Sequence, residues 1–139
     1  MARTKGRAQD CTPAQARQHL AHARSFLEVA ELAAEERDPA VEYSSVAASL
    51  AVLSGIAASD AACCQALLRR SRSEDHRDAE ALLGEITPGG RNAASSLRQL
   101  LDLNDTANHG LINVSAEDLK RAMGQAEKLV AFADEVVHR

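Results

Sequence analysis

The sequence predicts an all-α protein, an antiparallel bundle of four long helices with one additional short helix. By composition, 28 of the 139 residues are Ala, the strongest helix former, whereas the chain has no Trp, one Tyr and two Phe. Such a chain has few of the aromatic and β-branched residues from which sheets are built, so a β-sandwich or barrel is excluded. Apolar residues make up 45% of the chain, enough to cover a core, and they recur at helical spacing.

The first helix is expected to begin after a basic, flexible tail of residues 1–11, which leaves residues 12–139 as one helical domain. Thr12 is a typical N-cap residue, Pro13 suits the first helical position, and Gln15 completes a capping box. An apolar seam then follows at alternating spacings of four and three residues, and it comprises Ala16, Leu20, Ala23, Leu27, Ala30 and Ala34. Asp38-Pro39 is predicted to end this helix.

The second helix, predicted over residues 40–70, is the central one of the bundle because it is apolar on two sides. One stripe comprises Tyr43, Val46, Leu50, Leu53, Ala57, Asp60, Cys64 and Leu67, and the other comprises Val52, Ile56 and Cys63. Asp60 is a carboxylate where packing would favour Leu. Burying a carboxylate without a partner costs several kcal/mol, so Asp60 is expected to have one.

Three further helices are predicted after the polar segment 71–75. Ser73 is expected to cap a short helix that stops at residues 87–90. A fourth helix is expected to end at Asn108-His109-Gly110, and Ser115 to cap the last helix.

Charge and cysteine usage predict a cytoplasmic protein. The net charge of −4 provides no general attraction to nucleic acid. The three cysteines form neither a C-x-x-C motif nor an even disulfide framework, so free thiols are expected, with Cys63 and Cys64 as small buried apolar residues. No apolar leader follows the basic start, and polar residues interrupt the apolar stretch 46–58, so no membrane association is expected. His19 and His22 lack a third ligand at suitable spacing, and neither a metal nor a cofactor is predicted.

Residues 100–117, LLDLNDTANHGLINVSAE, resemble the signature region of the HEPN family, small helical-bundle proteins of toxin–antitoxin and phage-defence systems. That signature is an Arg, then a polar residue, then a His four to six residues after the Arg, commonly followed by a Gly and a Val-Ser-x-Glu helix start. Asn104 matches the polar position, His109 the histidine, and residues 114–117 the helix start. The resemblance covers roughly residues 12–138, although its diagnostic part is about ten residues long.

The chain departs from this signature at Leu103, which stands where the family has its Arg. For active members the resemblance implies a metal-independent endoribonuclease, in which the His transfers a proton and the Arg stabilises the phosphorane charge. Arg98 lies five residues before Leu103, is turned about 140° around the helix from it, and is better placed to pair with Asp102. Whether the protein is an enzyme is therefore left open.

The candidate site residues also have structural interpretations. His109, Asn104 and Asn108 can act as helix-end residues instead of facing RNA or a nucleotide. Asp60 is expected to pair with His76, in a structural contact or, alternatively, in a polar site with His109. Arg98 is a further candidate for binding.

Three functions follow. The first is a catalytically degenerate HEPN-like component of a toxin–antitoxin or defence system that binds RNA or a nucleotide or acts in regulation. The second is an active ribonuclease that uses His109, and the third is a structural adaptor. A homodimer is expected because the apolar seams exceed what one small bundle can cover, and a cognate antitoxin or nucleotidyltransferase is the protein partner that the resemblance implies.

Overall fold

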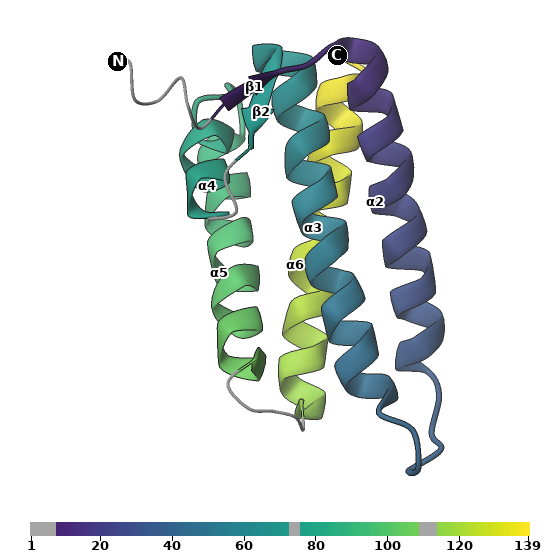
Figure 1. Cartoon of the computed structure of the whole chain (residues 1–139). Helices are drawn as coiled ribbons and strands as arrows, with labels where there is room; N and C mark the ends of the chain where they lie inside the picture. Colours follow the sequence, from purple (N-terminus) through teal and green to yellow (C-terminus); the bar gives the residue numbers. More distant parts are fainter. Residues whose placement is uncertain (1–7, 73–75, 109–113) are drawn as a thin grey trace.

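The computed structural model describes residues 8–72, 76–108 and 114–139, and this part of the chain is mostly helical, as predicted. It contains five helices and one two-stranded sheet (Figure 1). Their order is β1 (Ala8–Asp10), α2 (Pro13–Ala34), α3 (Tyr43–Leu67), β2 (Arg69–Ser71), α4 (Arg77–Leu83), α5 (Gly90–Asn108) and α6 (Ala116–Val137).

Helix α2 begins with the predicted capping box. The Thr12 hydroxyl accepts a hydrogen bond from the Gln15 amide at 3.1 Å, and the Thr12 amide donates to the Gln15 side chain at 2.9 Å. Ala16, Leu20 and Ala23 are buried, which confirms the predicted seam. The helix ends at Ala34, four residues earlier than the prediction at Asp38.

Helix α3 is the central helix, and it packs against α2, α5 and α6 (Figure 1). Its small residues allow this close packing: the buried Ser54 hydroxyl donates to the Ala23 carbonyl of α2 at 2.7 Å. Gly55 admits a still closer approach, because a Cβ atom at this position would lie 2.3 Å from Leu100 Cδ2 of α5. The fully buried large side chains include Leu97, Leu100 and Leu129, which fill the core around α3.

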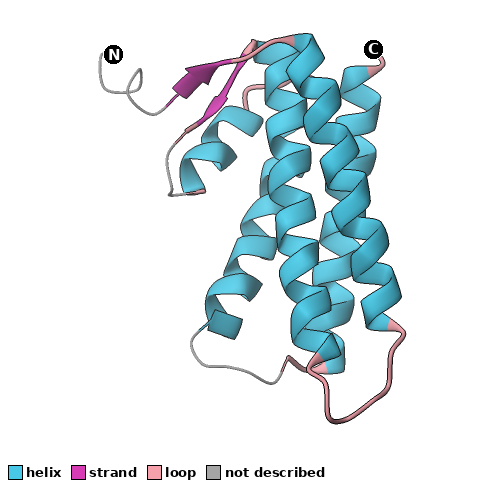
Figure 2. Cartoon of the chain, turned by 45° about the vertical axis from the view of Figure 1, so that its right-hand side comes forward, coloured by secondary structure: helices cyan, strands magenta, loops and turns pink. Residues whose placement is uncertain are grey.

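The two-stranded sheet is a departure from the prediction, which placed residues 8–11 in a flexible tail. Strand β1 pairs antiparallel with β2 (Figure 2). In this pairing Gln9 lies opposite Arg70. Helix α3 consequently stops at Leu67, three residues earlier than expected. Leu68 adopts a left-handed conformation with φ of 60°, which turns the chain out of the helix and into β2.

The remaining helices follow the prediction with shifted ends. Helix α4 begins at Arg77, and the expected cap Ser73 lies outside the described residues. Gly89 has a φ of 96°, a conformation that glycine adopts without strain, in the turn between α4 and α5. The Ser115 hydroxyl accepts from the Asp118 amide at 3.0 Å, which confirms the predicted cap of α6.

Helix α3 is also long and apolar enough to cross a membrane, by length and composition alone. The interrupted apolar stretch 46–58 lies within this longer helix, so the absence of a membrane association stays a prediction. Most of its apolar window is buried inside the structure.

Candidate functional sites

The segment that resembles the HEPN signature, residues 100–117, begins in the last turns of α5. Leu103, at the position of the family's Arg, is half-buried and packs against the main hydrophobic core. The next residue, Asn104, is also half-buried. His109 lies outside the described residues, and so does the side chain of Asn108, the last residue of α5. A packed Leu side chain has no charge with which to stabilise a phosphorane.

Arg98 does not form the ion pair that helical spacing suggested. Its guanidinium donates to the Ser95 hydroxyl at 3.4 Å, one turn earlier on α5. Asp102 instead accepts a hydrogen bond at 2.7 Å from Arg77, the first residue of α4. A residue 25 positions away along the chain has therefore replaced the local partner, because α4 folds back against α5.

Asp60 has the partner that its position demanded, but this partner is Arg70 and not His76. The Asp60 carboxylate lies 3.5 Å from the Arg70 guanidinium, and the two side chains are 16% and 26% exposed. His76 is exposed and occupies the N-cap position of α4, where its side chain makes no capping hydrogen bond. Arg70 was not predicted as the partner because residues 69–70 of strand β2, which returns Arg70 toward α3, were expected to continue the helix.

The environment of this ion pair changes the titration of two groups. Burial raises the pKa of Asp60 to about 6, and the positive charge of Arg70 only partly opposes this. On the neighbouring helix α2, the pKa of the His19 imidazole is lowered by burial, then by the charges of Arg70 and His22. His19, Asp60 and Arg70 therefore form a partly buried titratable cluster drawn from α2, α3 and β2.

The prediction of free thiols is wrong for two of the three cysteines. Cys11 and Cys64 form a disulfide that links the segment after β1 to the last turn of α3. Both are buried, together with Ala16. Cys63 is the free cysteine of the described residues, and burial is the main cause that raises its pKa to about 12. Sequence separation concealed the pair, because its two members are 53 positions apart.

A cavity of about 830 Å³ opens at the other end of the molecule, between the α2–α3 connection and the first half of α6. Val41, Tyr43, Leu119 and Met123 contribute apolar surface to it. A second cavity of about 190 Å³ shares Val41 and Tyr43 and is also lined by Val114, which begins the described range 114–139. The connection and the start of α6 thus form a recess that no single motif predicted.

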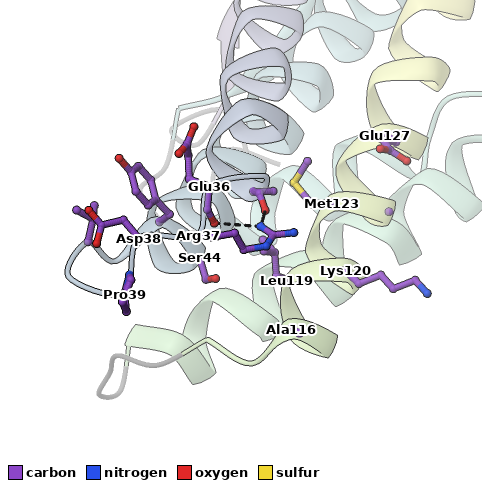
Figure 3. A pocket seen from close by; sticks show the side chains of 14 residues that line it. Glu36, Arg37, Asp38, Pro39, Ser44, Ala116, Leu119, Lys120, Met123 and Glu127 are labelled. Carbon is purple, nitrogen blue, oxygen red and sulfur yellow. Dashed lines mark hydrogen bonds between the residues drawn. The ribbon is translucent and has the colours of Figure 1, made fainter.

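The charges around the larger cavity are mixed. Arg37 and Lys120 carry positive charge, whereas Glu36, Asp38 and Glu127 carry negative charge. Arg37 is already engaged, because its guanidinium donates to the carbonyls of Ala34 and Glu36, each at 3.0 Å (Figure 3). The cavity therefore presents no net positive field for phosphate, and its chemistry suits a neutral or amphipathic group.

Within residues 8–72, 76–108 and 114–139, no three His, Cys, Asp or Glu side chains gather closely enough to hold a metal ion. Comparisons with protein-family models, curated proteins and solved structures returned no match to this chain.

Proposed function

We propose that this chain is a HEPN-like protein without ribonuclease activity, a binding or regulatory component of a toxin–antitoxin or defence system. Its four long helices are taken to form the antiparallel bundle of that family. The observation that carries the proposal is Leu103, which contributes its side chain to the core where the family's Arg would face the reacting phosphate. Loss of one preorganised charge-stabilising group typically lowers a rate by a factor of about 10²–10³.

The test is cleavage of a labelled single-stranded RNA in the presence of a metal chelator. We expect no cleavage by the wild-type protein, and we expect L103R to raise cleavage if the rest of the family's site is intact. L103M is the matched control, since it preserves the volume of the packed side chain. Far-UV circular dichroism verifies that each variant is folded.

Cleavage by the wild-type protein that disappears in H109A would contradict the proposal and establish an active ribonuclease. If neither the wild-type protein nor L103R cleaves RNA, and neither binds it in a fluorescence anisotropy assay, the HEPN-like function fails. The chain would then be a structural adaptor.

We further propose that the protein acts as a homodimer through the outer surface of α2 and α3. Val29 and Leu32 on α2, and Val46 and Leu53 on α3, are 44–60% exposed, which is unusual for large apolar side chains on two packed helices. Light scattering at micromolar concentration should give a molar mass of twice the 14.8 kDa of one chain. L53E should lower this mass toward that of the monomer. L68E, a change at an exposed Leu outside these two helices, is the control, and a wild-type monomer would contradict the proposal.

A further inference from the structure

The corner between α3 and β2 is held by the segment around Cys11. Leu68 occupies a left-handed conformation, which is strained for a residue that has a Cβ atom. Its amide donates to the Cys64 carbonyl at 3.2 Å, and its carbonyl accepts from the Cys11 amide at 3.0 Å. The two cysteines of the disulfide thus contact the strained residue from both sides.

Strand β1 itself brings little to this corner. It has three residues, of which Ala8 is half-buried and Gln9 and Asp10 are exposed. An isolated two-stranded pairing is marginally stable in water. The strand therefore depends on the covalent link that follows it, the Cys11–Cys64 disulfide.

Release of β1 would affect the charged cluster described above. Arg70 lies opposite Gln9 in the sheet, and it forms the ion pair with Asp60 on α3. Asp60 and Cys64 are four residues apart on the same helix and so lie on one face. The disulfide, the strand pair and the ion pair are consequently one connected unit.

The free cysteine beside the disulfide does not compete for it. Cys63 is 2% exposed, and its raised pKa keeps it in the thiol form, which is a poor nucleophile for a disulfide. Reduced chain therefore re-forms the Cys11–Cys64 pair, and oxidation selects one product.

We propose that the Cys11–Cys64 disulfide is a redox latch that holds residues 8–11 on the α3–β2 corner when oxidised and releases them when reduced. The reductant is a protein or small-molecule dithiol. One thiolate of the dithiol attacks a sulfur of the Cys11–Cys64 disulfide, which forms a mixed disulfide and releases the other cysteine. The second thiolate of the dithiol then attacks the dithiol sulfur of the mixed disulfide and releases the remaining cysteine. Two electrons and two protons pass to Cys11 and Cys64, and the dithiol leaves as its own disulfide. Because both sulfurs are buried, attack follows a transient opening of β1.

Limited trypsin digestion tests the latch, because β2 contains the cleavable residues Arg69 and Arg70. The air-oxidised protein and the protein reduced by dithiothreitol are digested in parallel, and cleavage after these two residues is followed by mass spectrometry. We expect reduction to raise the cleavage rate by at least about tenfold, since the local opening free energy falls when β1 is released. Hydrogen exchange at residues 8–11 and 68–71 should rise in the same step, while the helical circular dichroism signal of the reduced protein stays unchanged.

The variants separate a latch from a general loss of structure. C11S should be cleaved rapidly with or without dithiothreitol, and C63A, the matched control, should respond to dithiothreitol as the wild-type protein does. The proposal fails if the oxidised and reduced wild-type proteins are cleaved at equal rates, or if oxidised peptides link Cys63 to Cys11. It also fails if reduction removes the helical circular dichroism signal, because the disulfide would then support the whole fold rather than one corner.

Discussion

The two ends of the molecule are built differently (Figure 1). At one end, β1 and β2 pair, a disulfide links Cys11 to Cys64, and Asp60 on α3 pairs with Arg70. At the other end, the α2–α3 connection and the start of α6 line an open cavity of about 830 Å³. Both ends are attached to the same helical core.

The comparison shows that contacts between residues far apart in the sequence are concentrated at one end of the helices. The contacts that join distant segments at the first end are covalent or ionic, and they span 53 positions in the disulfide and 10 between Asp60 and Arg70. Around the cavity, the hydrogen bonds of Arg37 are instead local, to carbonyls one and three residues away. We therefore expect stability to depend most on the cross-linked end, and adaptability to be found at the end with the cavity.

The largest expected effect is the loss of the disulfide. Cross-linking residues 53 positions apart lowers the entropy of the unfolded chain enough to stabilise the fold by about 4 kcal/mol in the loop-entropy description. Urea denaturation should show that C11S, or the reduced wild-type protein, loses most of this free energy of unfolding. C63A, which leaves the disulfide in place, should lose about 1 kcal/mol. Equal losses in C11S and C63A would show that the disulfide adds no special stability to the cross-linked end.

The next effect is a pH dependence that originates at Asp60. Its pKa is about 6 in the folded protein against 3.8 in the unfolded chain, so the folded state binds the proton more tightly. The free energy of unfolding that protonated Asp60 contributes is therefore lost as pH rises from about 4 to about 6, and this loss is at most about 3 kcal/mol. The lowered pKa of His19 acts in the opposite direction, because its charging at low pH destabilises the fold.

The variant D60N isolates the Asp60 contribution. The difference in unfolding free energy between D60N and the wild-type protein should change across pH 4–6 in favour of the variant as pH rises. The stability difference between H76A and the wild-type protein should not follow this course across pH 4–6, because His76 is exposed and Asp60 pairs with Arg70. If the D60N difference does not vary with pH, Asp60 is not the buried acid that the structure places there.

The smallest expected effects are those of the two helix caps, one at each end. T12A and S115A each remove a hydroxyl that accepts a hydrogen bond from a backbone amide. Each should lower the free energy of unfolding by about 1 kcal/mol. Hydrogen exchange sharpens the comparison. S115A should loosen the first turn of α6 beside the cavity, whereas T12A should leave the first turn of α2 protected while the adjacent disulfide is intact. Equal loosening at both caps would show that the disulfide does not hold the start of α2.

Local features of this protein were predictable because they depend on residues three or four positions apart. The capping box of Thr12 and Gln15, the cap at Ser115 and the buried seam of α2 all belong to this class. The anomaly of Asp60 was also visible, because a carboxylate on an apolar stripe must be paired wherever the stripe is buried. In keeping with the helical composition, the described residues contain one short pair of strands.

The partners of these residues were decided by the tertiary structure. Asp60 pairs with Arg70 because Leu68 turns the chain back at the end of α3, and Asp102 pairs with Arg77 because α4 folds against α5. The Cys11–Cys64 disulfide joins the residue after β1 to the last turn of α3, and the pairing of β1 with β2 brings these two segments together. Each of these contacts joins segments whose approach is set by helix packing, and packing is a property of all the helices together, whereas a cap or a seam is encoded within one turn.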